Sequence, residues 1–265
     1  MDLQLTGKRA IITGGSKGLG LAAAHALAAE GVDIVIASRN QDVAKAAAAE
    51  VAARSGRRVV AIATDTGDDA SVRALVERAV EELGGIDILV NSASNQQVGR
   101  GYQRLAETSD QVFWDDVNIK VVGYLRTARA VAPHLVKQGW GRIINISGLG
   151  ARQAQSIVRT IRNVSVSALT KNLADELGPH GVNVTVVHPG TTRTETLRQR
   201  LQAQADLQGV DVAELERTKF KNSIGRIVDA SEVADVITFL ASPRSVAING
   251  DAIAVGGGQP GVVHY

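Results

Sequence analysis

Apolar residues gather into short runs rich in Val and Ile, and longer stretches that are alanine-rich or have apolar positions at helical spacing separate these runs. The runs at residues 33–38 and 86–91 are almost uninterruptedly apolar, which is typical of strands buried on both faces. This alternation predicts an α/β fold, a doubly wound parallel sheet with helices on both faces. The predicted strands are Arg9–Thr13, Asp33–Ser38, Arg58–Thr64, Ile86–Asn91, Arg142–Ser147, Val182–Val187 and Ala252–Val255, and the predicted helices lie near residues 18–30, 41–55, 68–84, 108–138, 153–178 and 230–241.

One stretch, residues 195–225, breaks the alternation because it is polar, helical in pattern and not followed by a predicted strand. Segments beyond the carboxyl ends of parallel strands carry the binding surface in such folds, so we expect a small helical lid over a ligand crevice. A helix pair that only decorates the surface is the alternative. No linker or change of composition divides residues 1–265, and we therefore predict a single domain.

A glycine-rich turn joins the first predicted strand to an apolar helix. Gly14, Gly18 and Gly20 give the spacing G-x-x-x-G-x-G within the segment GGSKGLG. Glycines there permit a tight turn and a close approach of backbone N–H groups and the helix N-terminus to a pyrophosphate. Because the turn lies within a β-α-β unit, it indicates a dinucleotide site rather than a turn with spare glycines.

The end of the second predicted strand indicates which dinucleotide binds. It reads Ala37-Ser38-Arg39-Asn40, with no acidic residue, and Lys17 lies in the glycine turn. A carboxylate at this place binds the ribose of NAD, whereas cationic groups bind the 2′-phosphate of NADP. NADP(H) is therefore favoured over NAD(H), with Arg39 as a solvated loop charge as the alternative.

Composition excludes several other kinds of site. The chain has no cysteine, its five histidines are scattered, and its 29 Lys and Arg balance 27 Asp and Glu without blocks of like charge. Disulfides, thiolate metal sites and cysteine nucleophiles are excluded, and neither a metal site nor a nucleic-acid partner is expected. No run of 18 apolar residues occurs, so we expect neither a membrane span nor a signal peptide, and a cytoplasmic location.

With these motifs the chain resembles the short-chain dehydrogenase/reductase family over essentially its whole length. TGGSKGLG matches the T-G-x-x-x-G-x-G turn, and Asp65-Thr66, Asn91-Ser92-Ala93-Ser94, Asn118 and Pro189-Gly190 with Thr194 stand at further motif positions of that family. The resemblance implies a Rossmann-type sheet of about seven strands, a small-molecule substrate and a homodimer or homotetramer. The cofactor contacts that the glycine turn, the strand end and the resemblance together predict are Gly14, Ser16, Lys17, Gly18, Leu19, Gly20, Ser38, Arg39, Asp65, Thr66, Asn91, Ala93, Pro189, Gly190, Thr192 and Thr194.

The chain departs from the family at its catalytic pair. In the family a tyrosine and a lysine lie four residues apart on the helix after the fifth strand, because a phenol with a pKa near about 10 needs an adjacent ammonium to act near neutrality. Aligned from Leu169-Thr170-Lys171, these two places fall on Arg159 and Asn163. The three tyrosines, Tyr102, Tyr124 and Tyr265, lie elsewhere, so we identify a divergent member that lacks the Tyr-x-x-x-Lys pair. Ser147 stands one position from the family's active serine.

The residues at these places have other chemistry available. Arginine stays protonated at physiological pH, so Arg159 cannot be a general base. Arg159 or Arg162 could bind a carboxylate or phosphate or polarise an oxyanion, or both could be surface charges left after the catalytic residues were lost. Asn163 can bind ribose hydroxyls. His188 could titrate in the crevice but is better explained as structural, Tyr102 could reach the crevice from its loop, and Arg193 could bind an anion or face water.

Three functions remain open from the sequence. The first is an NADP(H)-dependent oxidoreductase for a carbonyl or alcohol substrate, with an altered proton relay of Asn118, Ser147, Arg159 and Asn163. The second is a catalytically inactive nucleotide-binding protein that serves as a sensor, a regulatory subunit or a partner in a hetero-oligomer. The third is a non-redox enzyme that uses the dinucleotide structurally.

Overall fold

A single parallel sheet forms the centre of the protein in the computed structural model, which describes residues 1–94, 105–154, 156–219 and 221–260. The strand order is β3-β2-β1-β4-β5-β6-β9, and all pairs are parallel. The predicted α/β fold with a doubly wound parallel sheet is therefore confirmed. The strands are β1 (Arg9–Thr13), β2 (Asp33–Ser38), β3 (Val59–Ala63), β4 (Ile88–Asn91), β5 (Gly141–Ile146), β6 (Val182–Pro189) and β9 (Ala252–Val255).

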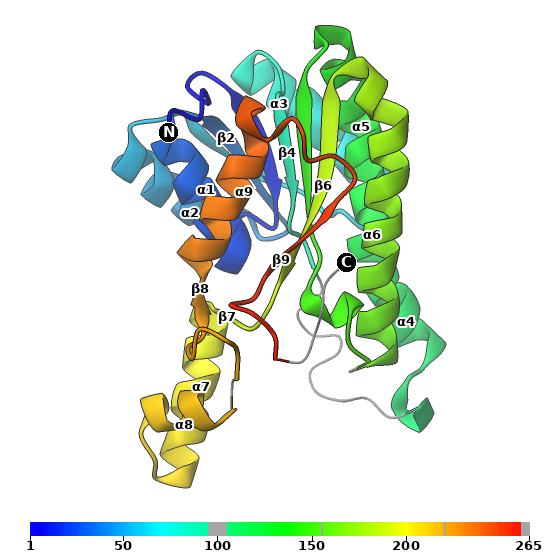
Figure 1. Cartoon of the computed structure of the whole chain (residues 1–265). Coiled ribbons are helices and arrows are strands. Elements are labelled where there is room, and N and C mark those ends of the chain that lie inside the picture. The colour runs from blue at the N-terminus through cyan, green and yellow to red at the C-terminus, as the bar shows by residue number, and fades with distance from the viewer. Residues whose placement is uncertain (95–104, 155, 220, 261–265) are drawn as a thin grey trace.

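Helices cover both faces of the sheet (Figure 1). On one face lie α1 (Gly18–Ala29), α2 (Gln41–Ser55) and α9 (Ala230–Ala241), and on the other α3 (Asp69–Leu83), α5 (Gly123–Gln138) and α6 (Ile157–Leu177). Successive strand residues point to opposite faces, so Ile12 packs with the first set of helices and Ile11 with the second. Both faces of the strands are apolar for this reason.

The helix predicted over residues 108–138 is interrupted. It consists of α4 (Asp110–Val117), a π-helical turn at Asn118–Val122, and α5. A π turn inserts one residue into the helical repeat and rotates the side chains that follow it, and such turns are frequent at functional sites. Short 3₁₀ turns lie at Leu105–Glu107, Leu149–Ala151, Gly178–His180 and Pro243–Ser245.

The segment predicted as a lid contains two helices, α7 (Glu195–Gln208) and α8 (Val212–Lys219), which project from the body as a separate pair (Figure 1). They enclose a small apolar cluster of their own. A two-strand ladder of β7 (Thr192–Arg193) and β8 (Val228–Asp229) joins the base of the pair, and no periodicity could predict strands of two residues. The cluster residues are Leu201, Ala205, Leu215 and Ile227.

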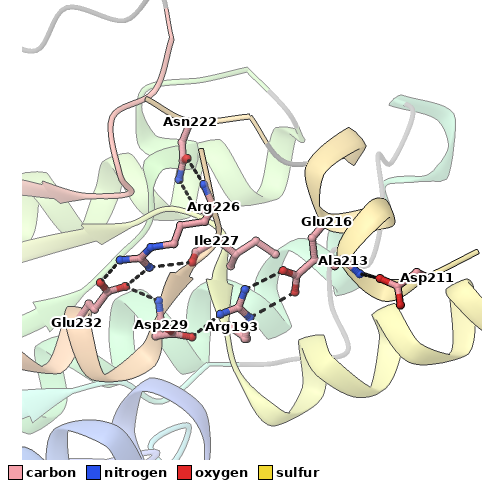
Figure 2. A network of polar contacts seen from close by, with 9 residues as sticks. All are labelled: Arg193, Asp211, Ala213, Glu216, Asn222, Arg226, Ile227, Asp229 and Glu232. Atoms are coloured by element: carbon pink, nitrogen blue, oxygen red, sulfur yellow. Dashed lines mark hydrogen bonds and ion pairs between the residues drawn. The ribbon is translucent and has the colours of Figure 1, made fainter. Parts of the chain in front are cut away.

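Ion pairs fix the helix pair to the rest of the fold, as Figure 2 shows. Arg193 contacts Glu216 of α8 at 2.7 Å and Asp229 of β8 at 2.8 Å. Arg226 contacts Glu232 of α9 through Nη1 at 2.8 Å. Arg193 therefore does not simply face water, one of the two alternatives that the sequence left open, but pairs with carboxylates of the chain itself.

Candidate active site

The carboxyl ends of β1 to β5 border a cavity of about 860 Å³, which we call the cofactor cavity. This volume is within the usual range of ligand-binding sites. It lies where the strand order reverses between β1 and β4, the place where open α/β sheets bind their ligands. Its walls bring together eleven of the predicted cofactor contacts: Gly14, Ser16, Lys17, Gly18, Leu19, Ser38, Arg39, Asp65, Thr66, Ala93 and Thr194.

The glycine turn leaves room for a ligand's phosphates. Gly14 has φ +66°, and a Cβ atom there would lie 2.9 Å from the backbone of Ala93. The α1 helix begins without a side-chain cap, so N–H groups of its first turn are available to an anion. The carboxylate of Glu195 already accepts one of them, from Gly18 at 3.2 Å. This turn fits the pyrophosphate of a dinucleotide.

The end of β2 offers cationic and hydroxyl groups. Arg39 is exposed on the cavity wall and makes no hydrogen bond or ion pair to any residue that the structure describes. Ser38 lies beside it and donates its hydroxyl to Asn40 O at 3.1 Å. Asp65 lies on the same cavity wall, beyond β3, where its Oδ1 accepts from Gly67 N at 2.8 Å. The phosphate of a ligand ribose would find its counter-charge in Arg39.

Two of the predicted cofactor contacts, Gly20 and Asn91, do not line the cofactor cavity. Gly20 instead packs against Gly14, where a Cβ atom would collide with the carbonyl group. Asn91 is fully buried below the cavity floor, donating to Asn145 Oδ1 at 3.0 Å and accepting from Thr127 at 2.8 Å. These residues support the site from beneath.

A second cavity of about 540 Å³ adjoins the first, and we call it the substrate cavity. It lies at the carboxyl ends of β5, β6 and β9, and Ser147 and Leu19 line both cavities. The first turn of α7 contributes Leu197 to its wall, and the segment after α8 contributes Lys221 and Asn222. Predicted residues on this wall are Leu19, Ser147, Arg159, Arg162, Asn163, Pro189, Gly190 and Thr192.

Three of the four predicted catalytic residues therefore meet in the substrate cavity. The Ser147 hydroxyl donates to the main-chain carbonyl of Asn163 at 3.1 Å. The Asn163 Oδ1 atom is buried without a hydrogen-bond partner among the described residues, and the Arg159 guanidinium makes no hydrogen bond to them. The Arg159 guanidinium is available to a ligand, and Asn163 lines the same wall with its Oδ1 atom buried.

The structure does not bring Asn118, the fourth residue, to the site. Its amide donates to Gly67 O at 3.2 Å and accepts from Arg126 at 2.9 Å, and it lines neither cavity. The π turn places Lys120 on the wall of the cofactor cavity instead. Successive side chains of a helix are rotated by about 100° around its axis. Asn118 and Lys120 are two positions apart, so their side chains point to nearly opposite sides of the helix.

The sequence named Arg162 as an anion binder or a surface charge, whereas the structure places it in a buried charged cluster beside Ser147, which sequence reasoning missed. Arg162 Nη1 contacts both oxygens of Asp116, at 2.6 and 2.7 Å, and these side chains are 9% and 0% exposed. Lys120 Nζ donates to Ser147 O at 3.1 Å. Burial, followed by the charge of Arg162, lowers the pKa of Lys120 to about 7, although Asp116 acts to raise it. A lysine in the apolar run VNIKVVGYL was the available signal.

Among the described residues, the other titratable candidates line neither cavity. His188 is buried and contacts Gly148 O at 2.9 Å and Ser167 at 3.2 Å, which agrees with its structural interpretation. The Tyr124 hydroxyl donates to Ile146 O at 3.0 Å, and burial raises its pKa further from neutrality. Tyr102 and Tyr265 lie outside the described residues.

The sheet order and the cavity at its switch point define the class of Rossmann-type nucleotide-binding proteins. Residues 8–205 match the short chain dehydrogenase family, and the chain belongs to this family of oxidoreductases. It is 35% identical over 257 residues to the short-chain reductase protein NovJ of Streptomyces niveus, covering 95% of this chain and 93% of that protein.

Solved structures agree with this assignment. An L-sorbose reductase from Gluconobacter frateurii, complexed with NADPH and L-sorbose, superposes with a TM-score of 0.90 at 29% identity, covering 99% of this chain and 100% of the other. A short chain dehydrogenase from Burkholderia cenocepacia in complex with NADP gives 0.80 at 32% identity, covering 96% and 98%. No helix in the described parts of the chain is long and apolar enough to cross a membrane.

Proposed function

We propose that the protein is an NADP(H)-dependent oxidoreductase that interconverts a small carbonyl compound and its alcohol. The observation that carries this proposal is the meeting of the two cavities at Ser147. A dinucleotide in one and a small molecule in the other would be adjacent there. When bound, the dinucleotide supplies or accepts a hydride, and the chain's own residues hold the substrate oxygen and exchange its proton.

The preference for NADP(H) rests on charge. Arg39 and Lys17 on the cofactor cavity wall are cations without partners among the described residues, and Ser38 adds a hydroxyl. Neither Arg39 nor Asn40, the residues directly after β2, supplies a carboxylate to bind an unmodified ribose. The dinucleotides carried by the Gluconobacter and Burkholderia proteins support the same preference.

The substrate side differs from the Tyr-x-x-x-Lys arrangement, because Arg159 and Asn163 stand at those two places of α6. The Ser147 hydroxyl, which donates to Asn163 O in this structure, would turn from that carbonyl to donate to the substrate oxygen. Arg159 supplies a fixed positive charge for an oxyanion or an anionic substituent. The unpartnered Asn163 Oδ1 accepts a ligand hydroxyl. In this proposal Asn118 holds Gly67 and Arg126 and takes no part in the relay.

The chain as a whole acts as one unit in this proposal. Residues 1–265 form a single domain, the helix pair within 195–225 closes the substrate cavity as a lid, and the assembly is a homodimer or homotetramer. Leu197, Lys221 and Asn222 on the cavity wall support the lid role. A second function, nucleotide binding without turnover, is favoured by Arg159 and Asn163, neither of which can act as the family's tyrosine or lysine does.

Binding and turnover separate the two functions. NADPH and NADH are titrated by fluorescence against wild type, Arg39→Ala and the exposed control Arg54→Ala. Ketoses, diketones and quinones are then screened for loss of reduced-nicotinamide absorbance. Binding with turnover that weakens in Arg159→Ala supports the oxidoreductase, and binding without turnover of any compound supports the second function. Absence of binding would overturn both.

A further inference from the structure

A carbonyl reductase needs a group that can give up a proton near neutral pH, and the residues at the family's catalytic places do not provide one. Arg159 stays protonated, Asn163 does not titrate, and the hydroxyl of Ser147 is a poor acid without a base. Tyr124 is fully buried, points at Ile146 O and lines neither cavity. Lys17 and Lys221 also line the cavities but are exposed, so the buried amine on these walls, among the described residues, is Lys120 of the π turn.

Lys120 lies in the wall of the cofactor cavity and contacts a residue that lines both cavities. Its side chain is on the wall of the cofactor cavity and only 5% exposed, and its Nζ is 3.1 Å from the carbonyl oxygen of Ser147, a residue that lines both cavities. An ammonium has three N–H donors, and the structure gives Nζ this one hydrogen bond. Two donor positions of Nζ therefore remain for a ligand or water.

The charges around Lys120 favour loss of its proton. From α4 it is faced by Asp116, and from α6 by Arg162 and Arg159. Both oxygens of Asp116 are engaged by Arg162 Nη1, so Lys120 has no carboxylate of its own. Burial and the two guanidinium groups lower the pKa of Lys120 to about 7, so that both protonation states are populated near neutrality.

We propose that Lys120 is the acid–base residue of this site, supplied by the π turn in place of the absent tyrosine. The proposal rests on the oxidoreductase function above. In the reducing direction an Nζ–H bond breaks and its proton forms the O–H bond of the product alcohol while the carbonyl carbon accepts a hydride. The neutral amine then takes a proton from solvent, and oxidation of the alcohol reverses these steps.

The protonation of Lys120 can be measured without cofactor or substrate. Protein labelled with [¹³C,¹⁵N]lysine contains eight lysine side chains, and the resonance of Lys120 is the one missing from both Lys120→Met and Lys120→Arg. We expect it to titrate with a midpoint near 7. A midpoint above about 10, the ordinary range of lysine, would overturn the proposal because Lys120 would then be a permanent cation.

Turnover gives the second readout, with the carbonyl compound that the screen identifies. We expect Lys120→Met and Lys120→Arg to lower kcat about 10²- to 10⁴-fold while NADPH binding is retained. Wild-type reduction should slow about tenfold per pH unit above the Lys120 midpoint, and both variants should lose this dependence. The exposed Lys171→Met is the matched control.

The two proposals fail in different ways. Turnover by Lys120→Met at the wild-type rate, with an unchanged pH profile, would overturn the role of Lys120 and leave the oxidoreductase standing. NADPH binding without any wild-type turnover would overturn the oxidoreductase and the catalytic role with it, even if Lys120 titrates near 7.

Discussion

Removing Asp116 should destabilise the protein more than any exposed charge change. Asp116→Asn keeps the shape of the side chain but leaves the buried Arg162 guanidinium without its counter-charge, next to Lys120. Loss of one partner of a buried pair costs about 3–5 kcal/mol, because the other charge stays desolvated. For 265 residues the unfolding entropy near 60 °C is about 0.56 kcal/mol per kelvin, so we expect Tm to fall by about 5–9 °C.

Thermal and urea unfolding of three variants test this reasoning. Asp175→Asn removes a pair of the same charge type on the surface of α6, where the partners are 60% and 64% exposed, and should cost less than about 1 kcal/mol. The double variant Asp116→Leu with Arg162→Met removes both buried charges and should recover most of the loss. The argument is refuted if Asp116→Asn costs no more than Asp175→Asn, or if the double variant is less stable than Asp116→Asn.

Further expectations concern the cofactor cavity and pH. Arg39→Ala should raise the Kd for NADPH about 10- to 100-fold and leave the Kd for NADH nearly unchanged, since only NADPH carries the extra phosphate. An equal loss of affinity for both dinucleotides in fluorescence titrations would contradict this. Glu195→Gln should tighten NADPH binding about two- to fivefold by removing a carboxylate from the N-terminus of α1, and weaker binding would count against it. Because the pKa of Lys120 is about 7 when folded and near 10.5 when unfolded, the unfolded chain binds more protons between these values. The free energy of unfolding of the wild type should therefore rise relative to that of Lys120→Met as pH increases from 7 to 10. A Tm difference between the two proteins that is independent of pH would exclude the lowered pKa of Lys120.

The sequence predicted the sheet well because its strands are buried on both faces. β1 and β2 begin and end at the predicted residues, since Ile11 and Ile12 serve opposite faces and both must be apolar. The break at Asn118–Val122 could not be predicted, because one extra residue in a helix barely changes its apolar periodicity. The two-residue strands β7 and β8 depend on contacts of the folded chain alone.

The site likewise contains residues that local motifs predict and residues that only the folded chain brings together. The glycine turn and the end of β2 are local motifs, and the structure brings most of their residues to the cofactor cavity. The pair of Asp116 and Arg162 joins residues 46 positions apart, and no local pattern links them. Asn118 fits a family motif by its letter, yet the π turn gives the cavity position to Lys120. Pattern matching therefore identified a residue of the right helix, and the helical geometry placed a different residue on the cavity wall.

The α7 and α8 pair has a consequence for how such a fold diversifies. It has its own apolar cluster around Leu201 and Leu215, and its charged attachment passes through Arg193 and Asp229. Mutations within it can therefore accumulate without loosening the central sheet. Exchange of the pair, with Arg193 and Asp229 kept as the splice points, would change the wall of the substrate cavity at Leu197, while Glu195 at the start of α7 would have to be kept to leave the glycine turn unchanged.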